Sequence, residues 1–180
     1  MEKRAEKKHK KGFTLIELIV AIAIVLLIGA AVTPMLLTHL KDAKVAATNE
    51  NLIAIKTAFD SAYTKNAGVL VDEGSDGNYL DDIYNEGWLS KLPSDQVFSS
   101  YQVKRYSDAN NNVSYYIQLA NEGADSYDMA KYIVSQLDRK LDNDNGNAQG
   151  AIQWNDSNAT STVTAFYLLY AEPGMSTWHE

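Results

Sequence analysis

The sequence predicts an α+β protein in which a long amino-terminal helix packs on a head built around an antiparallel sheet. Three features carry this prediction. An apolar run opens the chain, a one-sided apolar stripe with helical spacing follows it, and strand-like runs separated by turn residues fill much of the second half. The 180 residues leave room for one modest domain besides the helix.

The first part of the expected helix, residues 13–40, is apolar on all faces and contains one formally charged side chain, Glu17. As a helix it would be about 42 Å long, whereas the apolar core of a bilayer is about 30 Å thick. We therefore expect it to span a membrane. A lone acid in such a segment is costly and indicates a function. Gly29 and Pro34 interrupt the run, so we expect a kink or a locally loosened turn there.

An ordinary secretory signal or a plain anchor explains this segment less well. A signal peptide has an apolar core of about 7–15 residues and a small-residue cleavage site. Here the run is longer, and Ala30-Ala31-Val32 followed by Pro34 makes a poor site. A plain anchor accounts neither for the glycine in front of Phe13 nor for Glu17.

Charge is distributed unevenly along the chain. Residues 1–12 hold six Lys or Arg against two Glu, whereas residues 66–180 hold 17 acidic side chains against six basic ones. The basic segment beside an apolar helix places the amino terminus in the cytoplasm and the acidic part outside. The acidic head argues against nucleic acid as a partner, because that binding depends on cations that neutralise phosphates.

The stretch Lys11-Gly12-Phe13-Thr14-Leu15-Ile16-Glu17-Leu18 resembles the processing site of type IV prepilins and pseudopilins. The resemblance implies that residues 1–12 are a leader, removed by prepilin peptidase between Gly12 and Phe13, and that Phe13 is then N-methylated. It also implies the pilin fold, with a helical spine at 13–65 and an extracellular head at 66–180. The helix of that family is partly unwound in filaments near the positions of Gly29 and Pro34.

The resemblance further implies a structural role and no enzymatic activity. The subunit would be a single-pass membrane protein before assembly and part of an extracellular filament afterwards. In the filament, which is built by a pilus assembly machinery in the membrane, copies would pack through their amino-terminal helices. Glu17 of an incoming subunit would meet the Phe13 amine of a docked one. The alternatives are a minor pilin, a pseudopilin of a secretion or DNA-uptake system, and a membrane-tethered adhesive module.

After Leu40 the helix becomes amphipathic, and residues 41–65 should pack on the head. Its stripe consists of Val45, Leu52, Ile55, Phe59 and Ala62. We expect it to end near Asn66, with Gly68 as the stop signal. In the head, the patterns predict a short helix at 79–86, a hairpin of strands 97–106 and 113–120, a helix capped by Asp125 or Ser126 that reaches Leu141, and strands at 151–154 and 163–171.

The best candidate ligand site is the segment 142–147, where Asp142 and Asp144 alternate with asparagines before a glycine, as in the first half of a calcium loop. The twelfth position, which calls for glutamate, is Gln153, and the same residues also form plain turns. Major pseudopilins hold calcium in a carboxy-terminal loop, which keeps the hypothesis open. We expect no cofactor, because the three histidines are isolated. The chain has no cysteine, unlike many pilins that close a carboxy-terminal loop with a cystine.

Overall fold

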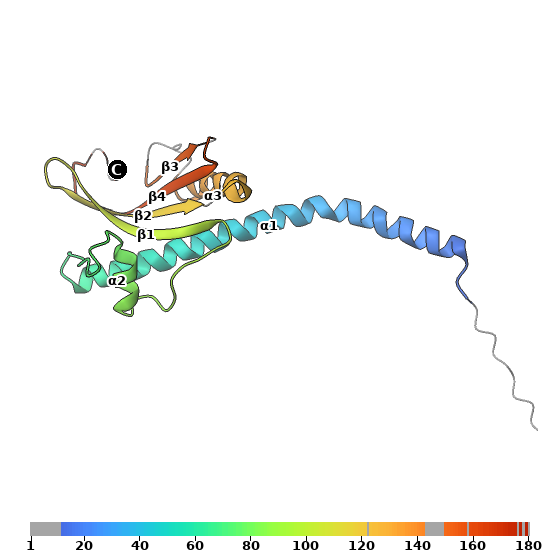
Figure 1. Ribbon diagram of the computed structural model, residues 1–180, viewed down its shortest axis with the longest axis horizontal. Coiled ribbons are helices and arrows are strands. Elements are labelled where there is room, and N and C mark those ends of the chain that lie inside the picture. Colours follow the sequence, from blue (N-terminus) through green and yellow to red (C-terminus); the bar gives the residue numbers. More distant parts are fainter. Residues whose placement is uncertain are drawn as a thin grey trace, which may run out of the picture. The chain divides into compact units, whose positions relative to one another are not determined.

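The computed structural model describes residues 12–121, 123–142, 150–157, 159–175, 177 and 179. It confirms the α+β class, with a long amino-terminal helix and a four-stranded antiparallel sheet (Figure 1). The elements in order are α1 (Leu15–Lys65), α2 (Tyr79–Asn85), β1 (Phe98–Ser107), β2 (Val113–Asn121), α3 (Ala124–Leu141), β3 (Ile152–Ser157) and β4 (Thr162–Ala171). The chain divides into two compact units at the Leu40–Lys41 bond.

In the second unit, the amphipathic part of α1 packs into the core of the head through the predicted stripe. Val45, Leu52, Ile55, Phe59 and Ala62 are all buried. The helix ends at Lys65, where Gly68 has a φ of +86° and its N–H donates to the Tyr63 carbonyl at 2.8 Å. This is the bond that closes a Schellman-type helix end, in which the residue with the left-handed conformation is Ala67, with a φ of +54°. The helix thus ends within one residue of the predicted position, and Gly68 directly follows the left-handed residue.

The four strands form an antiparallel sheet in the order β1-β2-β4-β3. The predicted hairpin of β1 and β2 is confirmed, with Val103 opposite Ile117. An irregularity between Phe98 and Ser100 shifts the register, so that Phe98 and Tyr101 are both buried although they are three residues apart. Such a bulge changes the alternation that strict strand periodicity would give.

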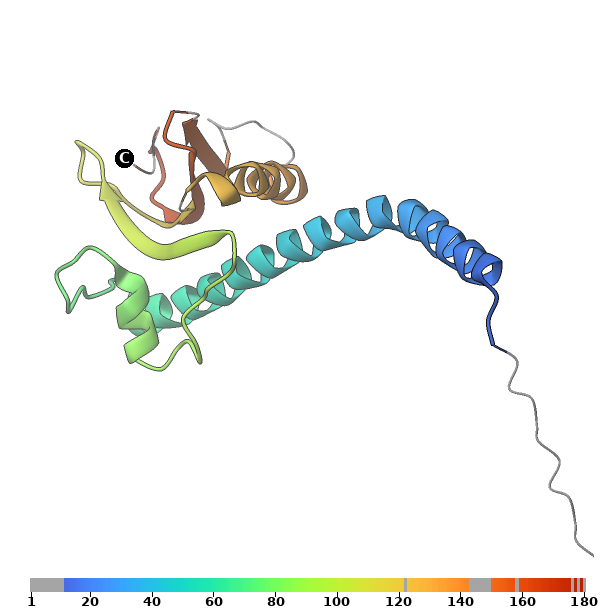
Figure 2. The same cartoon turned by 45° about the vertical axis from the view of Figure 1, so that its right-hand side comes forward.

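The core lies on one face of the sheet, where buried residues of α1, α2 and α3 meet those of the strands. Figure 2 shows the backbone of the sheet and of these helices in the head. Buried residues of α3 are Ala130, Ile133, Val134, Leu137 and Asp138. The helix ends at Leu141, as predicted, and this last residue is 45% exposed. The opposite face carries a smaller cluster around Tyr116 and Phe166, which lie on neighbouring strands.

The amino-terminal cap of α3 differs from the prediction. The cap residue is Gly123, which has no side chain to make a capping bond, and Asp125 and Ser126 lie inside the first turn. Instead, the buried side chain of Asn121 stabilises the start of α3. Its amide donates to the carbonyls of Gly123 and Ser161 and accepts the Val163 N–H at 2.6 Å. One amide thus joins the end of β2 to the starts of α3 and β4, which local sequence patterns do not reveal.

Residues 41–180 should form a soluble, folded monomer when they are produced without the preceding segment. Every buried hydrophobic residue of the described chain lies at or after Val45, so the truncation removes no core side chain. Circular dichroism and a cooperative thermal transition would test folding, and light scattering would test the monomeric state. Aggregation of this fragment despite its acidic charge would show that the head depends on the removed segment or on neighbouring subunits.

Candidate functional site

The candidate site is the start of the chain's apolar helix, beginning at the predicted scissile bond between Gly12 and Phe13. Phe13 is 91% exposed, and a side chain built on Gly12 would meet no atom within 4 Å. Within the described residues, nothing packs over this bond. A peptidase can therefore approach its backbone from the glycine side.

Thr14 and Glu17 form a capping box at the start of α1. Glu17 Oε2 accepts the Thr14 N–H at 2.8 Å and the Thr14 hydroxyl at 2.9 Å, and the Glu17 N–H donates to Thr14 Oγ1 at 3.3 Å. These bonds satisfy amide groups that have no partner within the helix. In the single subunit, the carboxylate thus has a local role that fixes where the helix begins.

This cap was not predicted, because the sequence pattern was interpreted only as an assembly role for Glu17. The signal was available, because a threonine followed three residues later by glutamate and an apolar run is the sequence signature of a capping box. Glu17 caps the helix, and its role in assembly stays a prediction.

From Leu15 to Leu40 the helix exposes apolar side chains on every face, and none of its residues is buried. The exposed fraction reaches 75% at Leu15 and is 64% at Met35. By length and composition, α1 is able to cross a membrane, and this agrees with anchoring before assembly. Lipid or other apolar helices must cover such a surface.

Gly29 and Pro34 lie inside a helix that continues without a break from Leu15 to Lys65. Pro34 has no N–H, so the carbonyl of Ala30 lacks its usual donor four residues later. Two threonines add side-chain bonds to the same region: Thr33 Oγ1 donates to the Gly29 carbonyl at 2.7 Å, and Thr38 Oγ1 donates to the Pro34 carbonyl at 3.2 Å. The helix is thus not interrupted at Gly29 or Pro34, and both the kink or loosened turn expected there and the partial unwinding in a filament stay predictions.

The proposed calcium loop lies mostly outside the described residues, which exclude 143–149 and therefore Asp144. Asp142 is described, and its Oδ2 accepts the Ile152 N–H at 3.0 Å. This bond joins the end of α3 to the start of β3. The described residues contain no group of three or more His, Cys, Asp or Glu side chains suited to hold a metal ion.

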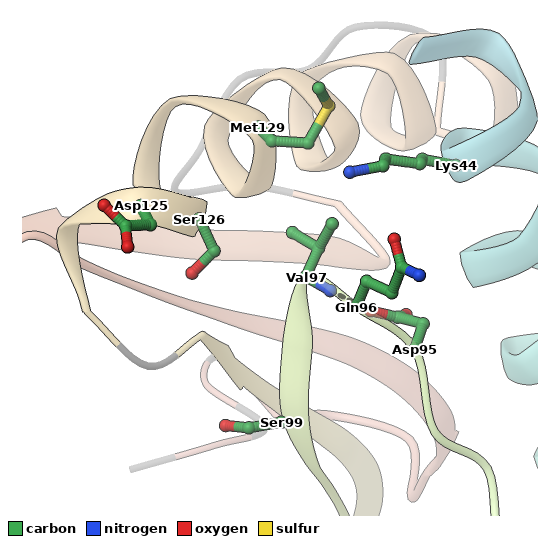
Figure 3. Close-up of a pocket in the computed structure, with 8 residues that line it drawn as sticks. All are labelled: Lys44, Asp95, Gln96, Val97, Ser99, Asp125, Ser126 and Met129. Carbon is green, nitrogen blue, oxygen red and sulfur yellow. Dashed lines mark hydrogen bonds between the residues drawn. The ribbon is translucent and has the colours of Figure 1, made fainter. Parts of the chain in front are cut away.

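A polar hollow of about 320 Å³ in the head also qualifies as a candidate site (Figure 3). Its lining includes Lys44 from α1, Asp95 and Gln96 before β1, and Asp125 and Ser126 from the first turn of α3. The Asp95 carboxylate is committed to structural bonds: Oδ1 accepts the N–H groups of Val97 and Phe98, and Oδ2 accepts the hydroxyls of Thr48 and Tyr101. Its role is therefore to join α1 to β1.

Comparison with known proteins supports the assignment of the amino-terminal segment. Residues 7–33 match the family model described as the prokaryotic N-terminal methylation motif. The chain carries the type IV pilin and pseudopilin signature. No curated protein and no solved structure gives a significant match. Beyond the pilin signature, the α+β architecture of the long helix and sheet is consistent with the pilin fold.

Proposed function

We propose that this protein is a structural subunit of a type IV pilus. The observation that carries the proposal is the methylation motif at residues 7–33, which covers the start of a helix whose apolar side chains are all exposed as far as Leu40. Prepilin peptidase removes residues 1–12 on the cytoplasmic side, and Phe13 becomes the N-methylated first residue. Residues 13–40 then serve first as the membrane anchor and afterwards as the assembly segment, while the acidic head faces outward.

Moving the apolar helix from lipid into a bundle of identical helices gains little from the hydrophobic effect, since lipid chains are as apolar as leucine. Extraction from the membrane therefore needs an external source of energy, which we assign to an ATP-driven assembly machinery. Filament packing replaces lipid around the same apolar surface. The protein itself needs no catalytic group for this function.

The same signature also occurs in minor pilins and in the pseudopilins of secretion and DNA-uptake systems. The abundance of the protein in filaments sheared from the cell surface separates these functions. A major pilin forms the bulk of that material, whereas a minor pilin or a pseudopilin is scarce or absent. A membrane-tethered adhesive module would stay with the membrane fraction.

The mature protein should begin at Phe13 and carry one added methyl group on its amine. Intact-mass measurement and amino-terminal sequencing of protein from its native cell test this expectation. Replacement of Gly12 by Val should leave the leader attached in nearly all of the protein, because a side chain there obstructs approach of the peptidase to the scissile bond. The full-length precursor would then accumulate in the membrane.

Replacement of Gly29 by Val is the matched control, because the same change is made at another exposed glycine, within the apolar helix. That variant should be processed normally, whatever its effect on assembly. A native protein that begins at Met1, or one that is cleaved after Ala31, would contradict the pilin assignment.

A further inference from the structure

The head contains a second cavity, of about 320 Å³, at the carboxy-terminal end of α1. This volume falls within the range of about 300–1,000 Å³ that is usual for small-molecule sites. Four segments of the head contribute to its lining: the end of α1 with the following loop, the start of α2, the β1–β2 hairpin and the end of β4. The lining residues are Tyr63, Gly68, Val69, Leu70, Tyr79, Arg105, Val113, Tyr115 and Glu172.

Three tyrosines contribute to the cavity wall: Tyr63 and Tyr79 are half-buried, and Tyr115 is buried behind them. The ring of Tyr115 lies 5.7 Å from that of Tyr63 and 5.7 Å from that of Tyr79, and both pairs meet edge to face. Tyr170 supports this wall from behind, with its ring centroid 5.0 Å from that of Tyr63. Burial and the hydrogen bond to Tyr170 raise the pKa of Tyr63 to about 12, so its hydroxyl stays neutral at physiological pH.

The sheet register brings a cation to the same wall. Arg105 is directly opposite Tyr115, and Tyr115 is opposite Tyr170, so the three residues form one row across β1, β2 and β4. Arg105 is exposed, and no salt bridge to it is present among the described residues. Its guanidinium is thus available to a ligand in the cavity.

The cavity also contains a carboxylate, that of Glu172, which is held against the start of β2. Glu172 Oε2 accepts the Val113 N–H at 2.8 Å, and the Glu172 N–H donates to the Val113 carbonyl at 3.0 Å. These two bonds fix the Glu172 side chain against the first residue of β2. The cavity therefore offers a fixed acceptor, a guanidinium donor and two half-buried tyrosines, Tyr63 and Tyr79, of which Tyr79 supplies the aromatic surface for stacking.

We propose that this cavity binds one ring of a neutral saccharide. A pyranose presents an apolar C–H face and a rim of hydroxyl groups, and tyrosine combines an apolar ring with a polar tip in the same way. Because Arg105 and Glu172 have opposite charges, each disfavours a ligand with the same charge as its own. A sugar hydroxyl suits both residues, since it can accept a hydrogen bond from the Arg105 guanidinium or donate one to the Glu172 carboxylate. The acidic head repels anionic polysaccharides, and this narrows the ligand to uncharged sugars.

The test is saturation-transfer NMR on the full-length protein in micelles of lauryldimethylamine oxide, a detergent that contains no sugar. The probes are the methyl glycosides of glucose, galactose and N-acetylglucosamine, with L-leucine as a zwitterionic probe. At least one glycoside should receive saturation at its ring C–H protons. Arg105→Gln and Tyr79→Ala should each weaken binding by about tenfold or more, because a hydrogen bond to a charged group and a stacking face are lost.

Two control variants match these changes. Lys104→Gln removes a positive charge from the adjacent position of β1, which points to the other face of the sheet, and Tyr84→Ala removes a partly exposed tyrosine from the same short helix as Tyr79. Both should bind like the parent. Arg105 is exposed, so Arg105→Gln keeps the test decisive even if Tyr79→Ala unfolds.

Three results would overturn the proposal. The first is the absence of saturation transfer to every glycoside. The second is binding that Arg105→Gln leaves unchanged. The third is binding of L-leucine alone, which would assign the charge pair to a zwitterion. Self-association that Arg105→Gln abolishes, without any glycoside signal, would assign the cavity to a second copy of the chain and would equally overturn it.

Discussion

A Glu17→Ala variant should be cleaved after Gly12 and remain in the membrane, yet its content in filaments should fall by at least about tenfold. Cleavage creates an amine at Phe13, which is mostly cationic near neutral pH. In a filament core of apolar helices, an unpaired amine is costly, and removing one partner of a buried ion pair costs about 3–5 kcal/mol. Glu17 is the only acid in residues 13–40 and hence the only side chain there able to neutralise it.

The capping box complicates this test, because Glu17→Ala also removes the acceptor of two hydrogen bonds from Thr14. Two further variants separate the two roles. Thr14→Ala removes the hydroxyl contacts and keeps the carboxylate, whereas Glu17→Gln keeps a side-chain oxygen that can accept from the Thr14 N–H and removes the charge. If the charge drives assembly, Glu17→Gln fails and Thr14→Ala assembles.

The measurement is the amount of each variant in sheared filaments, with the variant expressed as the only copy and its membrane level determined in parallel. Glu50→Ala is the control, since it removes an exposed acid from the same helix within the head. If Thr14→Ala fails while Glu17→Gln assembles, then helix capping is the role of the carboxylate. Normal incorporation of both Glu17 variants would show that the acid has no part in assembly.

Much of the fold was predictable because its signals are local. The end of α1 follows from Gly68, the β1–β2 hairpin from alternating runs around a turn, and the core face of α1 from residues at three- and four-residue steps. Each of these features is determined within a few neighbouring positions. The pattern of residues 11–18 likewise carries its signature within one short stretch, and it anticipated the family match.

The features that escaped prediction depend on contacts between distant segments. Asn121 caps the corner of α3 through partners as far away as Val163, and the row of Arg105, Tyr115 and Tyr170 exists only once three strands are in register. The bulge after Phe98 also has no clear local signal. A sequence pattern gives no account of such contacts, because they are created by the packing of whole elements.

Among the residues that connect distant segments, Asp95 has the largest expected effect on the stability of the head. Its carboxylate accepts the N–H groups of Val97 and Phe98 at 2.7 and 2.6 Å, and it accepts the hydroxyl of Thr48 on α1 at 3.2 Å. The Tyr101 hydroxyl also donates to it. Burial, followed by this hydrogen bond, raises the pKa of Tyr101, so the phenol stays protonated and remains a donor.

Replacement of Asp95 by Ala should therefore lower the free energy of unfolding of the head by about 3 kcal/mol, because donors that include the N–H groups of the buried residues Val97 and Phe98 lose a charged acceptor. The control is Asp125→Ala, which makes the same change in the same hollow at an exposed position in the first turn of α3. That variant should lose less than about 1 kcal/mol, the contribution of a favourable helix-dipole interaction.

Denaturant unfolding of residues 41–180 measures both variants, provided that this fragment folds as expected. A double-mutant cycle with Tyr101→Phe then isolates the contact between the carboxylate and the phenol. Because Tyr101 and Asp95 share one hydrogen bond, their effects should not add, and the coupling should be about 1 kcal/mol or more. Equal losses for Asp95→Ala and Asp125→Ala, with additive effects in the cycle, would show that the hydrogen bonds of the Asp95 carboxylate do not stabilise the head.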